Sequence, residues 1–272
     1  MNKSIFARLF VFLATLITFG FLGFMIGFIL VNGVPYLTSS LFEWNYTIAN
    51  VSLTPALITT LSVISGALFI ATPVGIFTAI YLVEYADRSK LIVKLISMAT
   101  DTLAAVPSIV YGLFGFLFFV LFLNFGFSLI AGVLTTTIMI LPLIIRATEE
   151  ALLSVGMSLR EASFALGAGK LRTIFNVILP VSMPGILSGI ILAIGRIIGE
   201  SAALIYTLGS STNLPGDLFS SGRTLAVHLY VLANEGFHLK EAYATAVVLL
   251  GLVLFLNSVS TLISRRLTKE GK

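Results

Sequence analysis

Six apolar stretches, each long enough to cross a lipid bilayer, constrain this chain more than any other feature. A membrane-spanning α-helix needs about 20 consecutive apolar residues. A chain in hydrocarbon must also satisfy its backbone hydrogen bonds internally, which a helix does. The sequence therefore predicts an all-α fold, a polytopic membrane helix bundle with six transmembrane helices. The stretches occupy residues 9–31, 56–83, 96–122, 127–147, 184–207 and 241–263.

The composition agrees with an integral membrane protein. Hydrophobic residues make up 58% of the chain and charged residues 10%, whereas an average soluble domain carries about 25% charged residues. A nucleic-acid partner would require basic residues gathered on one soluble face. Here they are scattered between apolar stretches, so we expect a lipid bilayer and no nucleic acid as partner. The chain has no cysteine, which excludes disulfides and thiolate metal ligands.

The basic residues between the stretches predict the orientation in the membrane. Cytoplasmic loops carry an excess of lysine and arginine, and most of the 16 basic residues fall on one side of the predicted bilayer. The loop 32–54 contains no basic residue and holds the only tryptophan, Trp44, so it should face outward. Both termini are then cytoplasmic. The basic residues on that side are Lys3, Arg8, Arg88, Lys90, Lys94, Arg146, Arg160, Lys170, Arg172, Arg265, Arg266, Lys269 and Lys272.

We expect two parts along the chain. Residues 1–54 form a first transmembrane helix and an outward loop, and this helix is retained because its apolar stretch is too long for a secretory signal. Residues 55–272 form the transmembrane core, with a cytoplasmic loop near 148–180. Within the core, Pro73 and Pro107 predict kinks. Asp101 either caps a helix near the cytoplasmic face or pairs with an arginine, and we favour the cap.

The polar insert before the fifth stretch predicts a short pair of helices in water. Ser158 and Glu161 have the spacing of a capping box, which would start a helix there. Gly167 and Gly169 should end that helix, because glycine accepts the left-handed conformation common at helix C-termini. A second, amphipathic helix would follow from Lys170, and Pro180 and Pro184 would turn the chain back toward the membrane. From these residues alone, a solvated loop with an amphipathic helix resting on lipid is an equal alternative.

The insert resembles the EAA motif of importer-type ABC permeases, E-A-A-x3-G-x9-I-x-L-P. The matching residues are Glu161, Ala162, Ser163, Gly167 and the run from Val177 to Pro180, with Ser163 in place of alanine and Val177 in place of isoleucine. The resemblance implies the importer-type ABC permease fold. It also implies that Glu161, Ala162, Ser163 and Gly167 form a coupling element that receives force from cytoplasmic ATPase subunits.

Two further segments resemble phosphate-importer permeases of the PstA type. They run from Asp101 to Gly112 and from Arg196 to Ser201, the latter reading Arg-x2-Gly-Glu-Ser. This resemblance implies a subunit that imports inorganic phosphate across the cytoplasmic (inner) membrane of a prokaryote. It further implies three kinds of protein partner: a homologous permease subunit, the ATPase subunits and an extracytoplasmic phosphate-binding protein. Permeases for molybdate, sulfate or phosphonate are the close alternative.

Arg196 and Glu200 are the candidate residues of the substrate pathway. An ionisable group within an apolar span is costly and usually functional. Arginine remains charged and can bind phosphate oxygens in a bidentate way. Glu200 lies four positions after Arg196, a spacing that would place both on one helical face. Glu200 could then orient the guanidinium and neutralise it. A pair of charges that only ties helices together is the structural alternative.

Other functions fit the sequence less well. The chain has no G-x4-G-K-[ST] motif, so ATP should be hydrolysed by another subunit and we expect neither enzymatic activity nor a cofactor. A proton-coupled secondary transporter often has an inverted repeat, and none is evident. An intramembrane hydrolase would need catalytic groups at membrane depth, but His228 and His238 lie in the outward loop 209–239. Their spacing does not predict a metal site, and we expect them to be interfacial.

Overall fold

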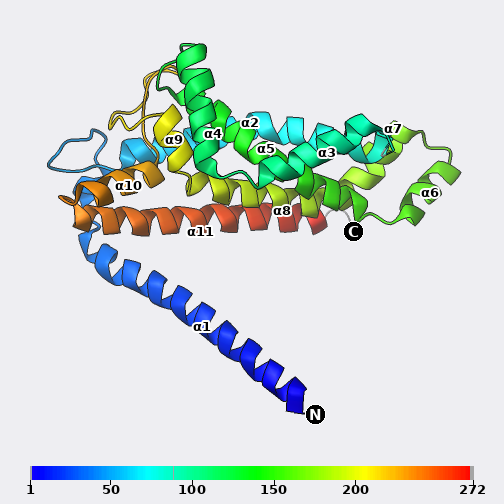
Figure 1. Cartoon of the computed structure of the whole chain (residues 1–272), viewed down its shortest axis with the longest axis horizontal. Helices are drawn as coiled ribbons and strands as arrows, with labels where there is room; N and C mark the ends of the chain where they lie inside the picture. Colours follow the sequence, from blue (N-terminus) through cyan, green and yellow to red (C-terminus); the bar gives the residue numbers. More distant parts are fainter. Residues whose placement is uncertain (1, 88, 270–272) are drawn as a thin grey trace.

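The computed structural model describes residues 2–87 and 89–269, and it contains no strand within them. Arg88 and Lys272, two of the residues used for the orientation, lie outside this described part. Four long helices pack along one another as the body of the bundle (Figure 1). They are α2 (Thr54–Ile80), α5 (Leu129–Leu153), α8 (Leu179–Ile198) and α11 (Leu239–Lys269). The all-α membrane bundle predicted from the apolar stretches is therefore confirmed.

Five apolar helical stretches in the described residues are long enough to span a membrane. They are Ala7–Tyr36, Thr54–Tyr85, Leu129–Leu153, Lys170–Ile198 and Leu239–Leu262. The third predicted span, 96–122, is a bent pair instead of one straight helix. Helix α3 (Leu91–Ala104) and the segment Ser108–Phe122 meet at 104°. Pro107 lies at this bend. Proline disfavours the helical conformation of the residue before it, so the helix breaks here.

The segment after the bend comprises α4 (Ser108–Gly115) and the π-helical η4 (Phe116–Phe122). Helix α4 packs against the short α9 (Ala202–Thr207), and this contact depends on Gly112. A Cβ atom added to Gly112 would lie 2.7 Å from the Cα atom of Ala203. Small residues at such points let helices in a bundle approach closely.

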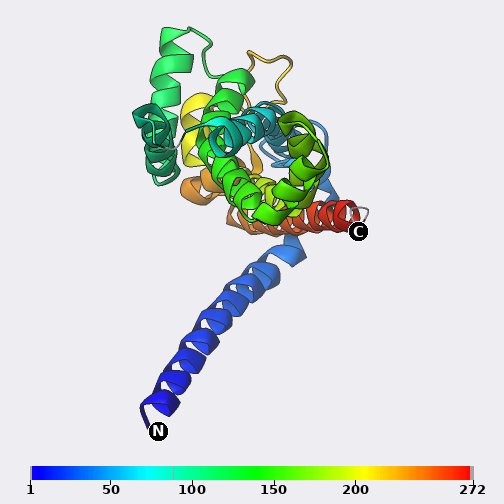
Figure 2. The same ribbon diagram turned by 90° about the vertical axis from the view of Figure 1, so that its right-hand side faces the viewer.

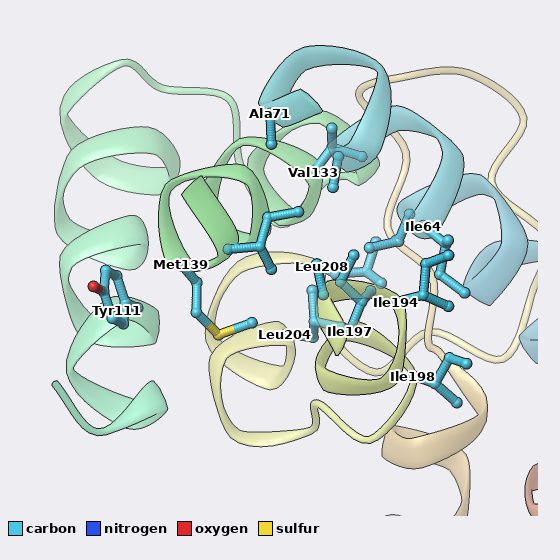
Figure 3. Close-up of a cluster of buried hydrophobic side chains, with 14 of the residues drawn as sticks. Ile64, Ala71, Tyr111, Val133, Met139, Ile194, Ile197, Ile198, Leu204 and Leu208 are labelled. Carbon is cyan, nitrogen blue, oxygen red and sulfur yellow. The ribbon is translucent and has the colours of Figure 1, made fainter. Parts of the chain in front are cut away.

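Helix α5 lies at the centre of the bundle and contacts α2, α8 and α9. Its buried side chains Val133 and Met139 lie within the main hydrophobic cluster, together with Ile64 of α2 and Ile197 of α8 (Figure 3). Gly75 of α2 allows α5 to come close, since a Cβ there would lie 2.7 Å from a side-chain carbon of Ile144. This core fixes the end of α8, where the candidate substrate residues lie.

The fifth span differs from the predicted 184–207 at both ends. It starts at Lys170 with α7 (Lys170–Thr173) and the π-helical η5 (Ile174–Ile178), which lead into α8 as one 29-residue stretch. The predicted turn at Pro180 and Pro184 is wrong. A π-helical turn, with its altered hydrogen-bond pattern, ends at Ile178, two residues before Pro180, and the helix continues through both prolines. The span ends at Ile198, and the short α9 follows after a break.

Helix α1 (Asn2–Gly33) stands away from the other spans (Figures 1 and 2). Its C-terminal end packs on α11, where the rings of Phe28 and Tyr243 meet edge to face with centroids 5.9 Å apart. Gly33 is required at this contact because a Cβ would lie 2.5 Å from the Val247 side chain. Two 3-10 turns, η1 (Val34–Tyr36) and η2 (Ser39–Phe42), then lead toward α2.

The two ends of the bundle carry different elements. Helix α6 (Met157–Ala165) and the C-terminal end of α11 lie at one end, and α10 (Leu225–Glu235) lies at the other (Figure 1). The π-helical η3 (Tyr81–Tyr85) closes α2 near α6. Placing the insert and the chain's C-terminal end together, opposite the loop 209–239, agrees with the orientation predicted from the basic residues.

Candidate functional site

The insert forms helix α6, which ends as predicted but starts differently. The cap residue at its start is Gly156, with no side-chain hydrogen bond, so the capping box predicted at Ser158 is wrong. The chain leaves α5 at Leu153 through a short turn, and Ser158 already lies inside the first helical turn. At the other end Gly167 has φ +80°. The amide of Gly167 donates to the Phe164 carbonyl at 2.9 Å, as in a Schellman motif.

Helix α6 has no buried residue of its own, although several of its side chains are apolar. Among the residues assigned to the coupling element, Glu161, Ala162 and Gly167 are exposed and Ser163 is half-buried. An exposed apolar group on a water-facing loop commonly marks a site of protein contact. The exposed apolar side chains of this segment are Met157, Leu159, Phe164 and Leu166.

Two polar contacts attach α6 to the rest of the chain. Arg160 forms an ion pair with Glu84 of η3, with nitrogen and oxygen 3.0 Å apart. The same guanidinium donates to the carbonyl of Leu152 at 2.9 Å and to that of Val155 at 2.5 Å. The second contact joins the hydroxyls of Ser163 and Thr173 of α7 at 2.8 Å. The serine that replaces the alanine of the EAA motif therefore makes a specific hydrogen bond.

Arg196 and Glu200 do not form the predicted pair on one helical face. Arg196 is half-buried in the last turn of α8, and Glu200 lies beyond the end of that helix. The buried Glu200 carboxylate accepts a hydrogen bond from the Ala203 amide at 2.9 Å, so it caps the start of α9. Within the described residues Arg196 makes no ion pair or side-chain hydrogen bond.

Asp101 is an arginine's partner, so the favoured prediction of a helix cap is wrong. It lies inside α3 and forms an ion pair with Arg146 of α5. Arg146 also pairs with Glu149 at 2.7 Å and donates to the Ser97 carbonyl at 3.2 Å. These residues line a cavity of about 490 Å³ between α3 and α5. The sequence placed Arg146 among the cytoplasmic charges, since nothing in the local pattern indicates its contact with α3.

His228 is buried, so the prediction that it is interfacial is wrong, whereas His238 is half-buried; Arg223, in the loop before α10, is buried as well. Arg223 is 4% exposed and His228 0%. The Arg223 guanidinium lies 4.8 Å from the centre of the Tyr46 ring, and the same ring meets His228 edge to face. Burial first, and the nearby Arg223 charge second, lower the pKa of His228 to about 3. His228 lies in the first turn of α10, and Arg223 lies directly before its N-cap residue Thr224, in a region that the sequence treated as an outward loop.

The structure places the two groups of predicted site residues in different parts of the chain. The coupling residues lie on and just after α6, whereas Arg196 and Glu200 lie beside α9 near the opposite end of the bundle (Figure 1). Helix α8, preceded by α7 and η5, connects the two regions. Sequence reasoning missed Glu84. The feature that could have indicated it is an acidic residue at the end of an apolar span.

Comparison with known proteins agrees with this arrangement. Residues 71–269 match the family described as "Binding-protein-dependent transport system inner membrane component". The chain is 32% identical over 227 residues to the probable ABC transporter permease protein YqgI of Bacillus subtilis (strain 168), covering 78% of this chain and 77% of that protein. It is 34% identical to a phosphate transport system permease protein PstA homolog of Mycoplasma genitalium, covering 90% of this chain and 39% of the relative.

A third relative is the phosphate transport system permease protein PstA 1 of Mycobacterium tuberculosis, 36% identical over 72% of this chain and 65% of the relative. This chain thus spans less than two thirds of the Mycoplasma and Mycobacterium relatives.

Two solved structures share the fold. One is the inward-facing MetNI methionine ABC transporter, with a TM-score of 0.62 and 20% identity over 79% of this chain and 93% of that chain. The other is a bacterial alginate ABC transporter, with a TM-score of 0.71 and 16% identity over 97% and 95%. The importer-type ABC permease fold is confirmed. The chain belongs to the family of binding-protein-dependent transport system inner membrane components, which are membrane permease subunits and not enzymes.

Proposed function

We propose that this chain is the transmembrane permease subunit of an ATP-driven importer that moves inorganic phosphate into the cytoplasm. The observation that carries the proposal is Arg196, a half-buried guanidinium at the end of a membrane span, with no ion pair within the described residues. A lone arginine there favours an anionic substrate, and its planar fork suits phosphate oxygens. The names of the relatives from Mycoplasma genitalium and Mycobacterium tuberculosis support phosphate in particular.

Glu200 has an indirect role in this proposal. Its carboxylate caps α9, and α9 packs against α4, so Glu200 fixes the helix next to Arg196. Because no carboxylate pairs with the Arg196 guanidinium within the described residues, its positive charge is not neutralised before the substrate arrives. The substrate-pathway residues are then Arg196, which contacts the anion, and Glu200, which positions the adjoining element.

At the cytoplasmic end we propose that α6 is the coupling helix and docks on an ATPase subunit. Its exposed apolar side chains and its lack of buried residues support a second protein as its cover. The exposed Glu161 and Ala162 would face that subunit, and Gly167 would end the helix at the interface. An extracytoplasmic phosphate-binding protein and a homologous permease subunit complete the proposed assembly. The solved alginate ABC transporter is likewise in complex with a periplasmic protein.

Reconstitution tests the proposal. The chain is copurified with its ATPase, partner permease and binding protein, placed in vesicles, and supplied with labelled phosphate. We expect uptake of labelled phosphate that requires ATP. Excess unlabelled phosphate should suppress this uptake, whereas sulfate or molybdate at the same concentration should not. Uptake driven by a proton gradient without ATP would contradict an importer powered by ATP. Equal competition by sulfate or molybdate would contradict phosphate as the substrate.

A further inference from the structure

Helix α6 depends on few contacts for its position. None of its residues is buried, so apolar packing within this chain does not hold it in place. Its side-chain hydrogen bonds to the transmembrane core, within the described residues, are those of Arg160 and the one between Ser163 and Thr173. Thr173 belongs to α7, the start of the fifth span, whereas the hydrogen bonds of Arg160 go to residues at the ends of the second span and α5.

Arg160 connects α6 to the ends of two other spans at once. It pairs with Glu84, which closes the second span, and it donates to the carbonyl of Leu152 in the last turn of α5 and to that of Val155 in the turn after it. The side chains of Arg160 and Glu84 are only 12% and 10% exposed. A bond network with so little access to water is screened less than a surface ion pair, and it has one preferred geometry.

The carbonyl contacts explain why an arginine serves here. The last carbonyls of an α-helix have no partner within the helix and need an outside donor. Nη1 of Arg160 donates to the Val155 carbonyl, Nη2 donates to both the Leu152 carbonyl and the Glu84 carboxylate, and Nε donates to Glu84 as well. A guanidinium has five donors in a fixed plane, whereas a lysine ammonium is a single point of charge. Lysine could not hold both helix ends in the same way.

The geometry points to Arg160 as a positioning residue that makes α6 move together with the cytoplasmic ends of the second span and α5. This inference rests on the proposed function, because it takes α6 as the helix on which the ATPase acts. Motion of α6 would reach α5 at the centre of the bundle directly through Arg160, in addition to the path through α7 into α8. Glu84 is the acceptor that keeps the guanidinium oriented.

The first test measures phosphate transported per ATP hydrolysed in vesicles that contain the complete transporter. Losing a charged hydrogen-bond network should lower this ratio at least about tenfold in Arg160→Ala, while ATP hydrolysis continues and the complex still copurifies. Arg160→Lys should lower the ratio of phosphate transported to ATP hydrolysed by less than Arg160→Ala does. Arg172→Ala is the matched control, because Arg172 is an exposed arginine of the same loop, and its ratio should stay near that of the wild type.

A ratio for Arg160→Ala that equals the wild-type value would overturn the inference. If Arg160→Ala does not assemble, Glu84→Gln decides, because it removes the charge of the acceptor and leaves both carbonyl contacts in place. An unchanged ratio for Glu84→Gln would overturn the inference, and a lowered ratio would support it. If the wild type itself shows no ATP-driven phosphate uptake, the proposed function fails instead, so the two failures are distinguishable.

A distance measurement separates coupled motion from simple loss of stability. The chain has no cysteine, so spin labels can be placed at Ser158 of α6 and Tyr81 of η3, which are both exposed. In the wild type the label separation should stay constant when a non-hydrolysable ATP analogue binds, because the two elements move as one. In Arg160→Ala the separation should change with nucleotide. A wild-type separation that changes equally would overturn the inference.

Discussion

Gly167 allows the role of backbone conformation to be separated from the role of space at the coupling loop. Its φ of +80° lies in the region that side chains rarely adopt, and its amide donates to the Phe164 carbonyl to close α6. A Cβ placed on Gly167 would meet no atom of this chain within 4 Å. Within the chain, therefore, a substitution acts through backbone strain and not through a clash.

The size of the effect follows from that geometry. The left-handed conformation costs an ordinary L-residue about 1–2 kcal/mol, which lowers the population of the closed motif by roughly 5–30-fold. Gly167→Val should pay this cost in full and lower uptake per ATP. Gly167→Asn should keep most of the coupling, because asparagine tolerates the left-handed region and occurs at this helix position.

The assay compares phosphate uptake and ATP hydrolysis in vesicles for the two variants and the wild type. Circular dichroism of the detergent-solubilised complexes checks that both fold. If Gly167→Asn loses coupling as completely as Gly167→Val, the conformational reasoning is refuted. The result would then indicate that any side chain at this position clashes with the ATPase subunit.

Two further predictions concern other parts of the fold. His228 has a pKa of about 3 in the folded chain against 6.5 when unfolded, so only the unfolded state takes up its proton as the pH falls below 6.5. Between about pH 6 and the folded pKa of about 3, stability should then fall by about 1.4 kcal/mol per pH unit on acidification, and His228→Gln should remove this part of the acid dependence of Tm. Gly112→Val should destabilise the contact with Ala203 by about 1–3 kcal/mol, whereas Gly195→Ala, where a Cβ meets no atom within 4 Å, should leave Tm nearly unchanged.

The features predictable from the sequence are those that depend on neighbouring residues. Apolar length predicted the spans, and the turn after α6 was predictable because Gly167 is the residue type that a left-handed helix end favours. Pro107 predicted a kink, but the 104° bend depends on how α4 packs against α9. A local pattern contains no information on such packing.

The errors at the candidate site have the same origin. Arg160 and Glu84 are 76 positions apart, and their contact depends on how the ends of the spans meet. Glu200 has the spacing of a helical partner for Arg196, but the helix ends at Ile198, and the free amide of Ala203 takes the carboxylate instead. Spacing places residues on a common face only while the helix continues.

Phosphate uptake by variants of Arg196 tests the central claim most directly. The complete transporter in vesicles is supplied with ATP and labelled phosphate, and the initial rate is compared for the wild type, Arg196→Lys and Arg196→Ala. Losing a charged contact to the anion should lower the rate of Arg196→Ala by about 10–100-fold, with Arg196→Lys between the two and all three complexes copurifying with the ATPase. Undiminished uptake by an assembled Arg196→Ala transporter would contradict the account.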